Sequence, residues 1–78
     1  MVMQIEEARA MSSDDLLDEL EDLREELYRL RFQKTTGQLE DFNLIRYTKR
    51  SIARVNTVLR ERELAAQLAA EEQVNDAE

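Results

Sequence analysis

Cationic side chains recur along one stretch of the chain at spacings that suit phosphate binding. Residues 29–62 hold nine lysines and arginines against three acidic residues, whereas residues 1–28 have a net charge of −8 and residues 63–78 one of −5. Within the basic stretch, Ala53 and Thr57 interrupt the arginines. Small side chains at these positions would let a phosphate backbone approach while guanidinium groups reach around it in forked contacts. The alternative interpretation of the same charges is a solvated helix face.

Two aromatic residues accompany these cations. On a helix, Tyr28 lies on the same side as Arg24 and Arg31, and Phe32 follows one turn later. Exposed aromatic rings beside arginines suit the stacking of bases or sugars. For Phe32 the alternative is burial beneath the N-terminal segment, because phenylalanine is commonly buried.

Most catalytic chemistry is excluded by composition. The 78 residues include no His and no Cys, so an imidazole base, a thiolate nucleophile, a Cys/His zinc site and a disulfide are all ruled out. Neighbouring carboxylates such as Asp14 and Asp15 point in different directions on a helix and suit a solvated face. We therefore expect no enzyme, cofactor, metal site or small-molecule substrate. We also expect a soluble, intracellular protein, because no stretch resembles a signal peptide or a membrane span.

The elements that must position the cations follow from a heptad pattern. Ser12 and Ser13, followed by two aspartates, are a start signal for one helix, and Asp41 is a candidate N-cap for a second. Apolar residues then recur in alternating steps of three and four, which is typical of helices that pack along a seam. The seam positions are Leu16, Leu20, Leu23, Leu27 and Leu30 in the first helix and Ile45, Thr48, Ile52, Val55 and Leu59 in the second.

The two seams predict an all-α fold, an antiparallel two-helix hairpin. Antiparallel pairing of the seams places the turn at Gly37, the only glycine of the chain. We expect helices from about Ser13 to Thr36 and from Phe42 to Leu64. Residues 2–10 should form a short helical segment in which Val2, Ile5 and Ala8 lie against the hairpin. Residues 1–64 would then be the functional hairpin. Residues 65–78 would be an acidic, Ala-rich extension that has helix propensity but no seam and is partly disordered, because its last residues fray.

The heptad positions also predict what each flank of the seam binds. One flank is like-charged, with Arg24 and Arg31 from the first helix and Lys49 from the second, which indicates that an external anion relieves the repulsion. The opposite flank is mixed and better suited to a protein surface. Its residues are Glu19, Glu26, Gln33, Leu44, Ser51 and Val58.

Two segments carry a family resemblance. Residues 30–40, Leu-Arg-Phe-Gln-Lys-Thr-Thr-Gly-Gln-Leu-Glu, and residues 52–61, Ile-Ala-Arg-Val-Asn-Thr-Val-Leu-Arg-Glu, resemble the two signatures of the bacterial large-subunit ribosomal protein numbered twenty-nine. The resemblance spans about residues 12 to 63. The chain departs from the family at Asp41-Phe42, where Asn-Pro is common, and at Asn56, where a base is common. The matching positions are Arg31, Phe32, Gln33, Gly37, Gln38, Ala53, Arg54 and Thr57.

The resemblance implies a structural protein bound to large-subunit ribosomal RNA near the exit of the polypeptide tunnel. It implies a neighbouring ribosomal protein, the one numbered twenty-three, and nearby docking of nascent-chain factors. It also implies a cytoplasmic ribosomal location, bacterial or organellar. The alternative function is a protein-only coiled-coil adaptor or cochaperone-like subunit, which would be expected to carry opposite charges across the flank. The predicted RNA-binding residues are Arg24, Tyr28, Arg31, Phe32, Gln33, Gln38, Arg46, Lys49, Arg50, Arg54 and Thr57.

Overall fold

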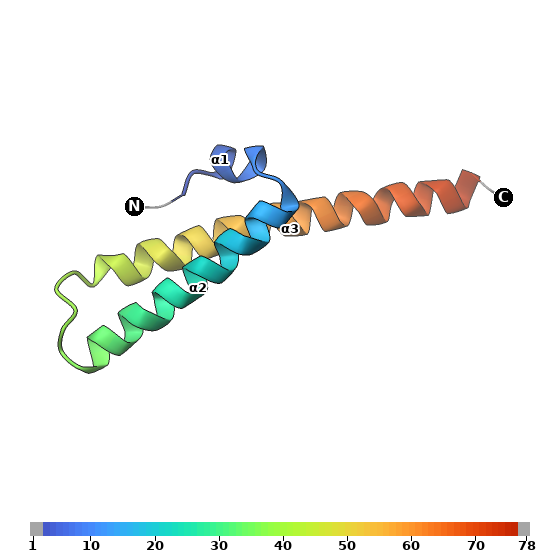
Figure 1. Ribbon diagram of the computed structural model, residues 1–78. Coiled ribbons are helices and arrows are strands. Elements are labelled where there is room, and N and C mark those ends of the chain that lie inside the picture. Colours follow the sequence, from blue (N-terminus) through green and yellow to red (C-terminus); the bar gives the residue numbers. More distant parts are fainter. Residues whose placement is uncertain (1–2, 77–78) are drawn as a thin grey trace.

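The computed structural model describes residues 3–76 of the chain, with side chains as far as Glu71. It contains α1 (Ile5–Ala10), α2 (Ser13–Thr35) and α3 (Asn43–Asp76), and no strand occurs within residues 3–76. Helices α2 and α3 run antiparallel, α1 lies beside α3 near the open end of this hairpin, and α3 continues beyond it as an arm (Figure 1). The molecule measures 62 × 21 × 17 Å. The predicted all-α hairpin is confirmed.

Helix α2 begins and ends at the predicted signals. The Oγ atom of Ser12 accepts a hydrogen bond from the backbone N–H of Asp15 at 3.1 Å, as an N-cap does. At the other end, the N–H of Gln38 donates to the carbonyl of Gln33 at 2.8 Å and the N–H of Gly37 donates to that of Lys34 at 3.2 Å. These two bonds form a Schellman motif. In this motif the first residue after the C-cap adopts a left-handed backbone conformation. Gly37 is this residue, with φ of 76°.

Helix α3 begins where predicted but extends further than predicted. Asp41 accepts hydrogen bonds from Asn43 N–H at its Oδ1 atom, at 2.9 Å, and from Leu44 N–H at its carbonyl, at 3.2 Å. The predicted end near Leu64 is wrong, because the helix continues to Asp76. Residues 65–71 are exposed and favour helix, with no glycine or proline to end it. The predicted fraying also concerns residues 77 and 78, which lie outside the described part of the chain.

The seam between α2 and α3 is packed along its whole length. Its buried members are Leu16, Leu20 and Leu30 from α2 with Thr48 and Val55 from α3, and the other five predicted positions are half-buried. The Thr48 hydroxyl donates to the carbonyl of Leu44 at 2.8 Å, so the polar seam residue is hydrogen-bonded. The heptad prediction of the core is therefore confirmed.

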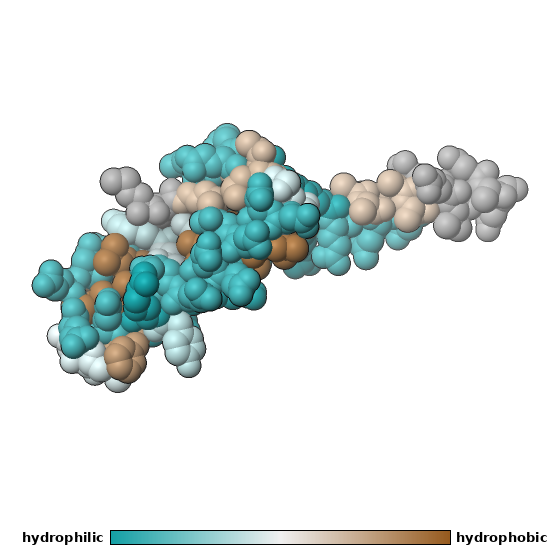
Figure 2. Space-filling model, in the orientation of Figure 1, coloured by the Kyte–Doolittle hydropathy of each residue, from teal (hydrophilic) through white to brown (hydrophobic). Residues whose placement is uncertain are grey.

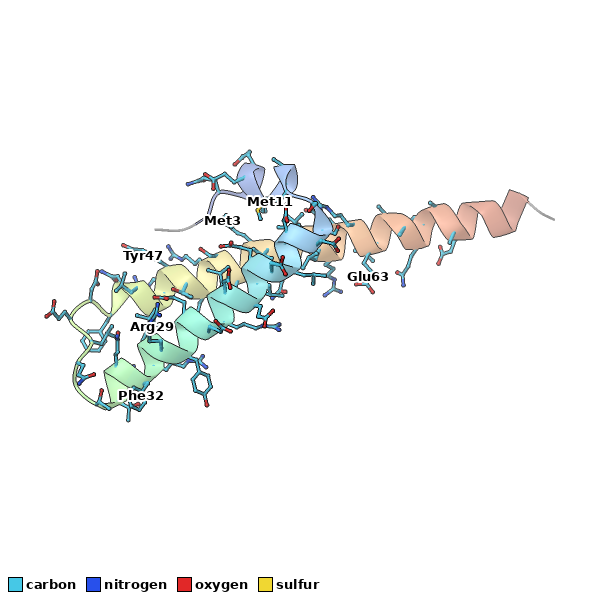
Figure 3. All side chains as sticks on the ribbon, in the orientation of Figure 1. Met3, Met11, Arg29, Phe32, Tyr47 and Glu63 are labelled. Atoms are coloured by element: carbon cyan, nitrogen blue, oxygen red, sulfur yellow. The ribbon has the colours of Figure 1, made fainter. Side chains whose placement is uncertain are left out.

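The N-terminal segment completes this core from the side of α3. Ala8 is fully buried, and Met3, Ile5 and Met11 pack against the cluster around it, as Figure 3 shows for the two methionines. Val2 lies outside the described residues. This packing corrects the prediction for two residues of the mixed flank, Ser51 and Val58, which are buried by the chain itself, whereas Leu44 of that flank is exposed.

The outer surface is mainly hydrophilic on the face shown in Figure 2, with hydrophobic residues confined to separate small areas. Between residues 3 and 76, no helix is both long and apolar enough to cross a membrane.

Candidate nucleic-acid interface

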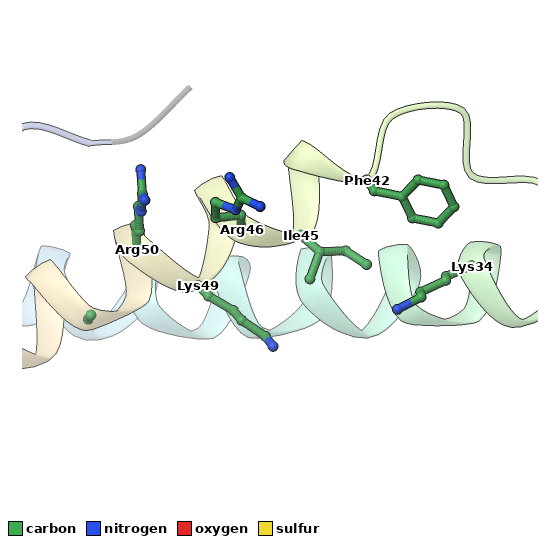
Figure 4. Close-up of a pocket in the computed structure, with 7 residues that line it drawn as sticks. Lys34, Phe42, Ile45, Arg46, Lys49 and Arg50 are labelled. Carbon is green, nitrogen blue, oxygen red and sulfur yellow. The ribbon is translucent and has the colours of Figure 1, made fainter.

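A groove of about 400 Å³ lies at the turn end of the hairpin, where the end of α2 meets the first half of α3 (Figure 4). Four of its lining residues are cationic and none is acidic, so the groove combines positive charge with an apolar floor. The lining residues are Lys34, Phe42, Ile45, Arg46, Lys49, Arg50 and Ala53.

The periodicity of α3 brings these side chains together. Arg46 and Arg50 are four residues apart and project from the same side of α3, whereas Lys49 projects in a different direction and Ile45 lies nearer Phe42 (Figure 4). Across the groove, the Lys34 ammonium lies 5.9 Å from the centre of the Phe42 ring, a cation–π distance. Cations from both α2 and α3 therefore border the apolar part of the groove.

These groove cations have no acidic partner in the described part of the chain. The ion pairs found there join Arg9 to Glu61 and Arg29 to Glu26, and neither pair touches the groove. Like charges held close together without carboxylates favour the binding of an anion from outside.

A second, smaller hollow of about 200 Å³ lies on α2, lined by Tyr28, Arg31, Phe32 and Thr35. Its two rings are open to solvent, because Tyr28 is 80% and Phe32 64% exposed. The alternative in which the N-terminal segment covers Phe32 is wrong. That segment packs on α3 at the open end of the hairpin, whereas Phe32 lies near the turn (Figure 3).

The remaining predicted residues have mixed surroundings. Arg24 is exposed on α2, and Gln38 is exposed in the turn. Gln33 is half-buried, and its carbonyl accepts the turn hydrogen bond from Gln38. Thr57 is exposed, but its hydroxyl donates to the carbonyl of Ala53 at 2.8 Å. The two glutamines thus belong to the turn that positions the groove rather than to its lining.

Arg54 has a partner inside the protein. Its guanidinium donates to the carbonyl of Met3 at 2.7 Å, and the side chain is half-buried. Arg62, which the sequence did not single out, donates to the carbonyls of Met11 at 2.6 Å and Arg9 at 3.2 Å. These two arginines fasten the N-terminal segment to α3 and lie outside the groove.

Sequence reasoning missed two lining residues of the groove, Lys34 and Phe42. A signal for Lys34 existed, because it stands four residues after Leu30 and so continues the leucine seam to the turn. Phe42 follows the predicted cap Asp41, but no periodicity indicates that its ring lies over the groove. Its position depends on the path of the turn.

The fold and the site together define a small all-α hairpin protein with a cationic, aromatic-bordered face. The family described as "Ribosomal L29 protein" matches residues 6–62, and the chain belongs to this family. It is therefore a structural protein of the large ribosomal subunit.

Relatives extend over most of the chain. The "Large ribosomal subunit protein uL29" of Carboxydothermus hydrogenoformans is 48% identical over 65 residues, which cover 83% of this chain and 94% of the relative. The protein of the same name from Desulforudis audaxviator is 52% identical, with 80% and 92% covered. That from Mycolicibacterium gilvum is 53% identical, with 74% and 75% covered.

Proposed function

We propose that this protein binds ribosomal RNA of the large subunit through the groove at the turn and the neighbouring hollow on α2. The observation that carries this proposal is the set of groove cations without acidic partners in the described part of the chain. Forked guanidinium groups bind phosphates well, and the exposed rings beside them suit stacking. The proposed RNA contacts are Arg24, Tyr28, Arg31, Phe32, Lys34, Phe42, Arg46, Lys49 and Arg50.

Three of the other predicted residues contribute to the structure beside the proposed contacts. Gln33 and Gln38 hold the turn, and Thr57 lies on the exposed side of α3 one turn beyond Ala53. Arg54 is left out of the proposed contacts, because its guanidinium already donates to Met3.

The charge arrangement favours RNA over the alternative of a protein-only adaptor. An adaptor hairpin would gain stability from opposite charges across its exposed flank, whereas this groove gathers only cations. On the other flank, Ser51 and Val58 are buried by the chain itself and so are not open to a protein partner.

We propose a cytoplasmic location on the ribosome, bacterial or organellar, near the exit of the polypeptide tunnel. The proposed neighbour is the ribosomal protein numbered twenty-three, and nascent-chain factors would dock nearby. Family membership supports this location.

The proposal is tested by photocrosslinking within assembled large subunits. A photoreactive amino acid replaces Arg50 in one variant and Ala66, on the exposed arm of α3, in a matched control. Position 50 is expected to crosslink to large-subunit RNA after a high-salt wash, and position 66 is not. Crosslinks from position 50 to protein alone would contradict RNA binding by the groove and favour the adaptor.

A further inference from the structure

The groove at the turn has a shape that a phosphate-binding surface alone does not need. Its floor is formed by the half-buried Ile45 and by Ala53, whose short side chain leaves space above α3. The Phe42 ring is 62% exposed beside this floor. The groove has a volume of about 400 Å³ and is open to solvent, so it would seat a flat group against its floor rather than enclose one. The cations would attract RNA without such an apolar recess.

We propose that this groove receives the base of a single unstacked nucleotide of RNA, a bulged or looped-out residue whose flanking phosphates lie on the arginines. The proposal rests on the proposed RNA-binding function and adds the kind of RNA that the groove selects. The base would lie on the Ile45–Ala53 floor beside Phe42, and Arg46 and Arg50 would hold the adjacent phosphates.

The chemistry of the lining favours this ligand over paired RNA. In a duplex the base faces are stacked on their neighbours, and only base edges and the backbone are accessible. The backbone would satisfy Arg46, Arg50 and Lys49 but leave the apolar floor and the Phe42 ring uncovered. An extruded base covers apolar surface with its face while its own phosphates reach the cations, so one nucleotide satisfies both parts of the groove.

The charges also favour a nucleotide over a peptide. A peptide that filled the apolar floor would need several carboxylates in fixed positions to meet Lys34, Arg46, Lys49 and Arg50. A nucleotide chain carries a phosphate at every residue, so it provides regularly spaced negative charge on both sides of the inserted base.

The test compares three short RNA hairpins of the same stem. One has a single bulged adenosine, the second has an abasic residue in the bulge, and the third has no bulge. Binding of the full chain to each is measured by fluorescence anisotropy at one fixed salt concentration. The first two RNAs carry the same number of phosphates. We expect the bulged adenosine to bind about tenfold more tightly than the abasic bulge, as loss of one stacked base predicts.

Two variants locate this effect in the groove. Ala53→Leu fills the recess without changing charge, and Ala66→Leu places the same side chain on the exposed arm of α3 as a matched control. Ala53→Leu should abolish the preference for the bulged base, and Ala66→Leu should retain it. Phe42→Ala, at an exposed position, should reduce the preference.

The outcomes separate this inference from the proposed function. Equal binding of the bulged and abasic hairpins, with both weakened by Arg46→Ala/Arg50→Ala, would overturn the nucleotide site and leave RNA binding by the arginines intact. A preference that survives Ala53→Leu would also overturn it. Binding of none of the three hairpins, together with crosslinks from position 50 to protein alone, would overturn both.

Discussion

Two pairs of arginines on α3 differ in whether they have hydrogen-bond partners inside the protein. Arg46 and Arg50, near the turn, border a groove in which they have no hydrogen-bond acceptor among the described residues. Arg54 and Arg62, further along the same helix, donate to backbone carbonyls of the N-terminal segment. The sequence presents all four as one basic run. What packs against the helix, rather than residue type, decides which arginines are left to bind an external anion.

The two halves of the hairpin differ in packing as well as in charge. At the open end, the N-terminal segment adds Ala8 and three half-buried apolar residues to the core. At the turn end only α2 and α3 meet, and Phe42 and Leu44 remain exposed. The open end is therefore expected to provide most of the stability, and the turn end most of the binding.

The largest expected effect is the loss of the core at the open end. Leu16→Asp places a carboxylate at a fully buried position and should lower the free energy of unfolding by about 3–5 kcal/mol. Leu17→Asp is the matched control, because the neighbouring leucine is 53% exposed, and should cost about 0.5 kcal/mol. Urea denaturation followed by circular dichroism measures both. Equal destabilisation by the two variants would contradict the described core.

The next effect concerns the arginines that hold the N-terminal segment. Arg54→Ala/Arg62→Ala should lower the free energy of unfolding by about 2 kcal/mol, because it removes charge-assisted hydrogen bonds that are partly screened by solvent. The salt dependence of RNA binding should not change. Arg60→Ala, at an exposed position, serves as the control for stability. A flatter salt dependence for the double variant would assign RNA contacts to these arginines and remove the contrast between the pairs.

Replacing the two groove arginines, Arg46 and Arg50, should affect RNA binding rather than stability. Arg46→Ala/Arg50→Ala should change stability by less than about 0.5 kcal/mol, because both side chains are exposed. It should reduce the slope of log binding constant against log salt concentration by about 1.4–1.8 units, as expected for two lost phosphate contacts. Binding titrations at several salt concentrations measure the slope. An unchanged slope would move the RNA contacts away from the groove.

The smallest expected effect is that of the acidic arm. Removal of residues 65–78 should leave incorporation into large subunits unchanged and alter RNA affinity less than about twofold at physiological salt, because exposed charges beyond roughly 8 Å are screened. Incorporation is measured by sedimentation of subunits that contain the shortened chain. Failure to incorporate would show that the arm packs into the particle.

The sequence was sufficient to predict the hairpin because its signals are local and periodic. The leucine seam, the single Gly37 and the caps Ser12 and Asp41 each act over a few residues, and they agree with one another. The length of α3 was predicted wrongly. Its heptad ends near Leu59, but helix continues wherever propensity favours it and nothing interrupts the chain.

The site was predictable only in part, for a physical reason. Charge counting found Arg46, Lys49 and Arg50, which the structure brings into one groove. It also included Arg54, which lies outside the groove and donates to the backbone carbonyl of Met3. Such a hydrogen bond leaves no pattern in the residue types of either partner, so charge counting could not foresee it. Phe42 depends on the three-dimensional path of the turn, which its own residue type does not specify.

The contacts of the N-terminal segment also set an order of events during synthesis. Its hydrogen bonds to Ser51, Arg54 and Arg62 join residues separated by 48 to 53 positions along the chain. The N-terminal segment therefore cannot be attached in full until Arg62 has left the ribosome that is making the chain, whereas α2 needs only its own residues to form its backbone hydrogen bonds. Attachment of the N-terminal segment thus follows synthesis of α3 as far as Arg62, and a chain released before Arg62 would leave the apolar side of α1 without its full attachment.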